Sequence, residues 1–156
     1  GTDLGIGSWS LKLQTHLFGT QDVRREQILH FPMGVIGLEE DHQWMLLGDQ
    51  EQPALAWLQS LSTPDANFPV ISPRRFFSDY QLFLDSSSLA PLHVAPQDQL
   101  YVLALVSHLE SCLTANLRAP IVLNVSRQLG RQVITVDNQP MQEVIGEMGN
   151  AVRRSA

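Results

Sequence analysis

The stretch Leu55-Ala-Trp-Leu-Gln-Ser-Leu-Ser-Thr-Pro-Asp-Ala-Asn-Phe-Pro-Val-Ile71 decides the fold class of this chain. It holds two short apolar segments, 55–61 and 68–71, and Pro64-Asp65 lies between them as a turn signal. Short apolar segments bounded by proline, glycine and aspartate are typical of β-strands joined by tight turns. The stretch therefore predicts two neighbouring strands.

The same pattern recurs along the chain. Trp9-Ser-Leu-Lys-Leu13 alternates between apolar and polar residues, which places Trp9, Leu11 and Leu13 on one face of a half-buried strand. Further strand candidates are residues 27–31, 43–47, 80–84, 121–125 and 132–136. Many short strands with frequent turns predict an all-β, mainly β fold, a barrel or a sandwich, and 156 residues suit one domain.

Residues 100–117 allow two interpretations. Apolar residues recur there at intervals of three or four, from Val102 to Leu117, which on pattern alone favours an amphipathic helix. The alternative takes Leu100-Tyr-Val-Leu-Ala-Leu-Val106 as a buried strand, in keeping with its length and its valine and tyrosine content. The resemblance given below favours the strand.

The two ends of the chain differ from its middle. Residues 1–8 are rich in glycine and are expected to be a flexible start or an expression remnant outside the fold. Residues 9–138 form the expected β domain. In the extension 139–156, Met141, Val144, Ile145, Met148 and Val152 fall on one helical face, which predicts a marginal C-terminal helix.

Charge limits the classes of partner. The formal net charge is −6, so direct binding of nucleic acid is not expected, because phosphate binding requires a surplus of lysine and arginine. A basic protein partner fits this charge better. No apolar run approaches the ~18 residues of a membrane span, and no basic-then-apolar leader opens the chain, so a cytoplasmic location without membrane contact is expected.

The segment Phe31-Pro-Met-Gly-Val-Ile-Gly-Leu-Glu39 predicts a loop of defined shape. Pro32 fixes its own φ and favours an extended Phe31, while Gly34 and Gly37 permit backbone angles that other residues avoid. Two interpretations remain open for this loop: a binding surface, or a buried crossover between two strands.

Catalytic and metal-binding motifs are absent from the sequence. The five histidines lack the spacing of zinc ligands, the single Cys112 resembles a small core residue, and no nucleotide-binding or nucleophile motif occurs. No cofactor and no metal are therefore expected. Glu39, Glu40 and Asp41 stand before His42, where an acid/base pair is conceivable, but consecutive charges usually form a solvated face that a basic partner can meet.

Aromatic residues are concentrated in Phe76-Phe-Ser-Asp-Tyr80. In a strand, Phe76 and Tyr80 would share one face and Phe77 the other, so one aromatic side is expected near the surface. Aromatic residues often anchor interfaces, but they also fill cores, and both roles stay open for Phe76 and Tyr80.

Three blocks in order resemble the family of FliW flagellar assembly factors. They are Phe31 to Glu39, Trp57 to Tyr80, and Thr114-Ala-Asn-Leu117 followed by Ala119-Pro-Ile-Val-Leu-Asn124 and Gly130-Arg-Gln-Val-Ile134. The similarity covers about residues 9 to 136. The resemblance implies a small, barrel-like, mainly β protein with a few short helices and no enzymatic activity.

The resemblance also implies two protein partners in the bacterial cytoplasm. FliW proteins bind flagellin before export, and they bind CsrA, an RNA-binding repressor of flagellin translation, so that the two partners are exchanged. We expect Glu39, Glu40 and Asp41, with Asp49 and Glu51, to contact the basic partner and Phe76 and Tyr80 to serve as apolar anchors. Structural roles are expected for Phe31, Pro32, Gly34, Gly37, Asn116 and Pro120.

Two rival hypotheses remain. The chain could be an interaction module of similar fold in another export pathway, or a hydrolase that uses His42 beside the acidic run. The oligomeric state is left open by the sequence.

Overall fold

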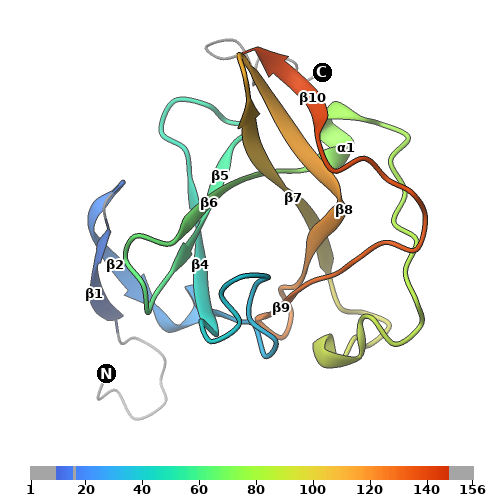
Figure 1. The fold of residues 1–156 in the computed structure, drawn as a ribbon. Helices are drawn as coiled ribbons and strands as arrows, with labels where there is room; N and C mark the ends of the chain where they lie inside the picture. The colour runs from blue at the N-terminus through green and yellow to red at the C-terminus, as the bar shows by residue number, and fades with distance from the viewer. Residues whose placement is uncertain (1–9, 16, 148–156) are drawn as a thin grey trace.

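The computed structural model describes residues 10–15 and 17–147, and β-strands are the main regular structure in this part of the chain (Figure 1). The strands in chain order are β1 Ser10–Thr15, β2 Gly19–Arg24, β3 Leu29–His30, β4 Gln43–Gly48, β5 Ala56–Ser60, β6 Asn67–Ile71, β7 Leu100–Leu109, β8 Cys112–Asn124, β9 Leu129–Gln132 and β10 Glu143–Glu147. The short helices are η1 Arg25–Gln27, α1 Pro73–Phe76 and η2 Ala90–Leu92. The expected mainly β class is confirmed.

Seven strands close into a barrel. The sheet runs β8-β7-β6-β5-β4-β3-β9, and β9 pairs back with β8. All of these pairings are antiparallel except that of β3 with β9, where His30 faces Leu129 in a parallel bridge. This seam is reinforced by Gln128, whose side chain donates to the carbonyl oxygens of Arg25 and Ile28.

The barrel interior holds the main hydrophobic core. Alternation along β5 turns Leu58 inward, and Trp57 therefore lies on the outer face. The buried members of this core are Leu29, Phe31, Val35, Trp44, Leu58, Ala66, Val70, Ile121 and Leu123. The ring of Trp44 packs against Phe31 and Phe68 at centroid distances of 6.2 and 5.9 Å.

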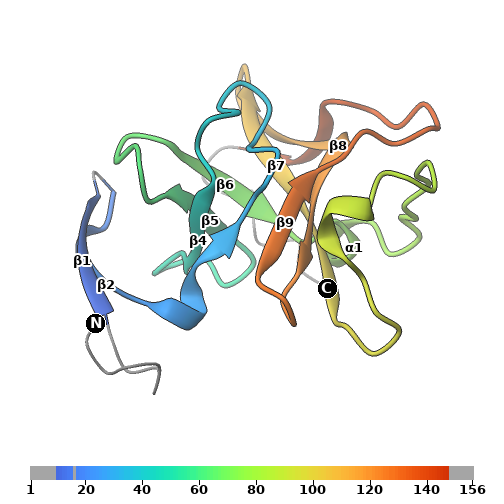
Figure 2. The ribbon, with the colours of Figure 1, turned by 90° about the horizontal axis from the view of Figure 1, so that it is seen from below.

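Two further layers cover parts of the outer face. The β1–β2 hairpin packs Leu13 and Val23 against Met45 of β4, and both views place it beside β4, away from β8 (Figures 1 and 2). On the other side, Tyr80 packs with Ile71, with Ile145 of β10 and with neighbouring residues in a second outer core. The outer face between these two layers includes Trp57 and Pro69.

Strand β8 belongs to the barrel and also pairs with β10, which lies in the C-terminal extension. Its residues Ile121 to Asn124 pair with β9, whereas Cys112 to Ala115 pair with β10. Residues 100–117 are thus two paired strands, β7 and the start of β8, and the strand interpretation of 100–106 is confirmed. The helical interpretation is wrong for this segment.

Three expectations from the sequence are corrected here. The C-terminal helix expected from Met141 to Val152 is wrong for Glu143–Glu147, which form β10, while residues 148–156 lie outside the described part. The strand expected at 80–84 is wrong, because these residues are irregular; Phe76 ends helix α1, so the shared face that a strand would give Phe76 and Tyr80 does not form. Residues 133–136 follow β9 as an irregular segment, although 129–132 are a strand.

Candidate functional site

The loop between β3 and β4, residues 31–42, buries some of its side chains in the barrel and exposes others. Phe31 and Val35 are buried in the barrel core, whereas Met33 and Ile36 are more than half exposed. Val35 and Leu38 form a bridge around Ile36 and Gly37, where Gly37 has a φ of +91°. The loop therefore buries one side in the barrel and exposes the other, and its role as a binding surface stays a prediction.

Gly34 allows this loop to fold onto itself. Its φ is +66°, and a Cβ atom there would lie 2.5 Å from the Cα atom of Glu39. Only glycine tolerates both conditions. The acidic residues that follow are thereby placed against the glycine turn.

The three carboxylates of the acidic loop, Glu39, Glu40 and Asp41, point to different partners. Glu39 Oε2 accepts the backbone N–H of Gly37 at 3.0 Å, and Asp41 Oδ2 accepts the hydroxyl of Ser60 at 2.9 Å. Glu40 is exposed. Among residues 10–15 and 17–147, no ion pair neutralises any of the three, so the acidic loop carries an uncompensated negative charge.

His42 is not paired with these carboxylates. Its Nε2 atom donates to the backbone carbonyl oxygen of Glu39 at 2.9 Å. A general base needs its partner side chain within hydrogen-bond reach, and here the carboxylate of Glu39 is engaged by Gly37 instead. The arrangement gives no support to the hydrolase hypothesis.

A second acidic group, Asp49 and Glu51, lies at the far end of β4. The acidic loop precedes this six-residue strand and Asp49 follows it, so the two groups are about 20 Å apart at ~3.3 Å per residue. The structure does not bring the five predicted acidic residues into one patch. An interface of standard size, about 800 Å² per partner, is wide enough to cover both groups.

Asp49 organises the turn that follows β4. Its Oδ1 accepts the indole N–H of Trp57 at 3.0 Å, and its Oδ2 accepts the backbone N–H groups of Glu51 and Gln52 at 3.1 and 2.9 Å. These hydrogen bonds, that of Trp57 first, lower the pKa of Asp49. Asp49 is therefore a fixed negative charge.

A hollow of about 300 Å³ adjoins this turn. Leu17 and Phe18 at the tip of the β1–β2 hairpin line one side, and Trp57 and Glu51 line the other. Sequence reasoning named Asp49 and Glu51 but missed the aromatic residues beside them, because the hairpin tip and β5 are about 40 residues apart and no local pattern joins them.

The aromatic anchors expected at 76–80 are largely internal. Tyr80 is 6% exposed, and its hydroxyl donates to the carbonyl oxygen of Leu117 at 3.0 Å, so the expectation of an exposed anchor is wrong for Tyr80. Burial, with a smaller contribution from the charge of Asp137, raises the pKa of Tyr80. Phe76 is partly buried against the second outer core and lies 6.5 Å from Phe77 between ring centroids.

Asn116 and Pro120 hold a bend in β8. The side-chain oxygen of Asn116 accepts the backbone N–H groups of Arg118 and Ala119 at 3.0 and 3.1 Å. Pro120 is buried, and its carbonyl oxygen accepts the N–H of Val133 at 2.9 Å. Both residues therefore have a structural role in β8. Pro32, in contrast, is exposed at the start of the loop between β3 and β4.

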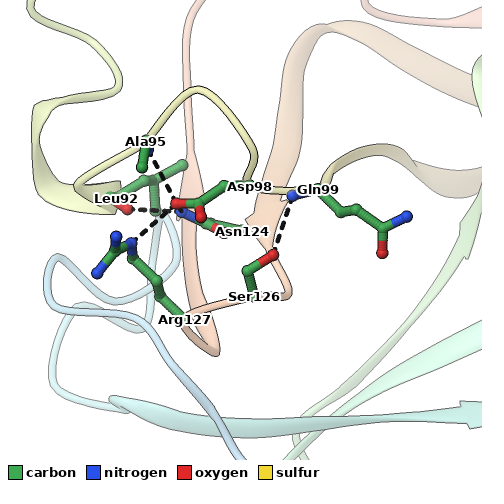
Figure 3. A network of polar contacts seen from close by, with 7 residues as sticks. All are labelled: Leu92, Ala95, Asp98, Gln99, Asn124, Ser126 and Arg127. Carbon is green, nitrogen blue, oxygen red and sulfur yellow. Dashed lines mark hydrogen bonds and ion pairs between the residues drawn. The ribbon is translucent and has the colours of Figure 1, made fainter.

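A polar network around Asp98 fixes the segment that leads into β7 (Figure 3). Asp98 Oδ2 accepts the side-chain amide of Asn124 and the N–H of Ala95, both at 2.9 Å, and it pairs with Arg127 at 2.8 Å. These contacts lower the pKa of Asp98 to about 2, with the bond from Asn124 as the largest cause. The sequence does not reveal this network, because Asp98 and Arg127 are 29 positions apart.

No metal site and no membrane-spanning helix occur in the part of the chain that the structure describes. Within residues 10–15 and 17–147, no three His, Cys, Asp or Glu side chains are grouped so that they could hold an ion. The helices in that part are too short to cross a bilayer.

Comparisons with known proteins point to one family. The model of the family described as "FliW protein" matches residues 12–144. The flagellar assembly factor FliW of Geobacillus sp. (strain WCH70) is 36% identical over 126 residues, which are 80% of this chain and 87% of that protein. The flagellar assembly factor FliW of Caldanaerobacter subterraneus subsp. tengcongensis is 33% identical over 146 residues, 90% of this chain and 97% of that protein.

A solved structure agrees with this similarity. The crystal structure of a flagellar assembly factor FliW superposes with a TM-score of 0.78 at 31% identity, covering 85% of this chain and 94% of that one. Both the fold and the sequence are therefore shared over most of the chain.

Proposed function

The chain belongs to the FliW family of flagellar assembly factors, and we propose that it is a non-enzymatic adaptor that binds flagellin and the RNA-binding repressor CsrA in turn. The proposed compartment is the cytoplasm, where both partners would meet it. Flagellin would occupy the protein until it is exported, and the freed protein would then sequester CsrA.

Uncompensated acidic charge is the observation that carries the choice of a basic partner. The chain has a formal net charge of −6, and neither the acidic loop nor the pair Asp49 and Glu51 is in an ion pair within the described residues. A protein that binds RNA needs a Lys and Arg surplus on its surface. Opposite charges raise the association rate and favour such a partner over an acidic one.

An exchange of partners requires antagonism between two binding events. If flagellin lowers the affinity for CsrA about 100-fold, the coupling free energy is about 2.7 kcal/mol, and CsrA must lower the affinity for flagellin by the same factor. Overlapping sites would give complete exclusion. Separate sites would need two conformations with different affinities.

Size-exclusion chromatography tests the exchange directly. The protein is mixed with CsrA, with flagellin, and with both, and the composition of each peak is measured. The expected result is two binary complexes and no ternary complex, with CsrA displaced as flagellin is added. A stable ternary complex, or no binary complex with either protein, would contradict the proposal.

Charge reversal tests the contribution of the acidic loop. Glu39→Lys combined with Glu40→Lys is expected to weaken CsrA binding about tenfold in titration calorimetry at low salt, with a smaller effect at high salt because salt screens exposed charges. An unchanged affinity would remove the acidic loop from the interface.

A further inference from the structure

The outer face of the barrel is left open between its two covering layers. In the strand register, Leu47 of β4 lies opposite Trp57 of β5, which lies opposite Pro69 of β6. Leu47 packs with the core under the β1–β2 hairpin, and Leu55, two residues before Trp57, packs with the second outer core. Trp57 and Pro69 lie between these two cores.

The outer face is open here because β6 and β7 are paired over a short length. These strands are paired only at Val70 with Leu105 and at Ile71 with Ala104. The next position on β6 is Pro69, which has no N–H to continue the ladder. Beyond it, a hollow of about 370 Å³ lies between the strands, lined mainly by apolar atoms of Leu55, Trp57, Pro69, Val106 and Leu113, with His108 at its side.

Trp57 is a wall of this apolar hollow and also of the acidic hollow beside Asp49. Its indole N–H is held by Asp49, and Phe18 packs edge-on against it at 6.2 Å between centroids and 70° between planes. The ring is therefore fixed between the two hollows. We call the two hollows, with Trp57 between them, the Trp57 groove.

The two ends of the Trp57 groove differ in chemistry. Asp49 and Glu51 supply negative charge at one end, and within the described residues neither has a cationic partner. Aromatic faces beside carboxylates attract lysine and arginine side chains through cation–π and ionic contacts. The other end is mainly apolar, and Ser107 and His108 are its polar residues.

We propose that the Trp57 groove binds a segment of the RNA-binding partner, with a large apolar side chain in the hollow beside Pro69 and a neighbouring arginine or lysine between Trp57 and Glu51. This inference rests on the proposed function. Charge complementarity selects the RNA-binding partner over flagellin, because a protein that binds phosphates displays exposed cationic side chains and this end of the groove is anionic. An apolar anchor beside a charge pair is the combination found at interface hot spots.

Two variants probe the two ends of the groove. Glu51→Lys reverses the charge at the acidic end, and His108→Trp fills the apolar end with a larger side chain; both positions are exposed, so folding should be unaffected. The matched controls are Asp85→Lys and Ser86→Trp, at two exposed positions outside the groove, in the loop whose Ser88 carbonyl oxygen contacts Arg131 of β9. Urea unfolding of each variant verifies that it is folded.

Calorimetric titration with purified CsrA, and separately with purified flagellin, gives the answer. Both groove variants are expected to weaken CsrA binding about tenfold or more, and both controls to stay within about twofold of wild type. The salt dependence of CsrA binding should also become shallower in Glu51→Lys, which a purely structural effect would not cause.

The failures are distinguishable. If the wild-type protein binds neither CsrA nor flagellin, the proposed function fails. If it binds CsrA and both groove variants bind CsrA equally well, the groove proposal is overturned while the proposed function stands. If the groove variants weaken only flagellin binding, the assignment to the RNA-binding partner is overturned.

Discussion

Gly130 of β9 lies against the ring of Phe31: a Cβ atom at position 130 would come within 2.5 Å of ring atoms Cε1 and Cζ and within 2.9 Å of Leu123 Cδ2. Phe31 and Leu123 are fully buried in the barrel core and have little room to move. The ring of Phe31, at the start of the loop between β3 and β4, therefore fits into the barrel because residue 130, almost 100 positions later, has no side chain.

Gly130→Ala is expected to destabilise the protein by about 1–3 kcal/mol, because the added methyl group overpacks a closed core. The free energy of unfolding in urea measures this loss. Gly48→Ala is the control, since a Cβ atom at Gly48 meets nothing within 4 Å. Equal stability of the two variants would show that the ring of Phe31 moves aside at no cost.

Gly34→Ala and Gly19→Ala form a second matched pair. Their φ angles are nearly the same, +66° and +65°, but a Cβ atom at Gly34 would lie 2.5 Å from the backbone of Glu39, whereas one at Gly19 meets nothing within 4 Å. Gly19→Ala should therefore lose only the conformational cost, about 1 kcal/mol, and Gly34→Ala should lose about 1–3 kcal/mol more. Thermal unfolding compares them, and similar melting temperatures would contradict the close packing of the glycine loop.

Tyr80→Phe removes the buried hydrogen bond to the carbonyl oxygen of Leu117 and leaves that oxygen without this donor. The expected loss of stability at pH 7 is about 1–3 kcal/mol, and Tyr101→Phe, at a side chain that is 51% exposed, should change stability by less than about 0.5 kcal/mol. Because the pKa of Tyr80 is raised on folding, its stabilising contribution is present below about pH 10 and is lost as the pH rises further. Urea unfolding at pH 7 and in the alkaline range measures both effects.

Asp98→Asn should change the acid sensitivity of the fold. The pKa of Asp98 is about 2 in the folded protein and about 3.9 in an unfolded chain, so the unfolded state binds more protons between these values. The contribution of Asp98 is complete above about pH 4 and is lost as the pH falls toward about 2. The difference in unfolding free energy between wild type and Asp98→Asn should be constant from pH 7 to about 5 and shrink below about pH 4. A difference that stays constant down to pH 2 would contradict this role.

Local patterns in the sequence were enough for most of the barrel. The segments 43–47, 55–61, 68–71 and 121–125 all lie in or around observed strands, because each is a short apolar run closed by a turn residue. The interval pattern within 100–117 is ambiguous by itself, since alternation and helical spacing overlap in a run of apolar residues. Pairing of β7 with β8 resolves it, and pairing is not a local property.

The C-terminal segment shows where local reasoning fails. Val144 and Ile145 fit a helical face, but in β10 the register shifts between Val144 and Gly146, and Ile145 is fully buried in the second outer core. A bulge of this kind breaks the simple alternation that marks a strand. The tertiary contact with β8 therefore outweighs the helical pattern.

The candidate site was only partly predictable. Acidic residues and glycines were identifiable from composition, but their grouping depends on which ends of β4 they flank. Tyr80 was indistinguishable from a surface anchor because an aromatic residue in a short polar segment serves either purpose. The surroundings of Trp57 were not predictable, because Phe18 contacts it through packing of the hairpin and Pro69 lies opposite it through strand pairing.

The parallel bridge between His30 and Leu129 also sets an order of events during synthesis. The two residues are 129 − 30 = 99 positions apart, so at about 5–20 residues per second the ribosome needs about 5–20 s after His30 to deliver its partner. Until then, the edge of β3 that faces β9 in the folded protein has no partner strand. A truncated transcript that ends before Leu129 would therefore release a polypeptide with an open sheet edge, which is prone to aggregation and proteolysis.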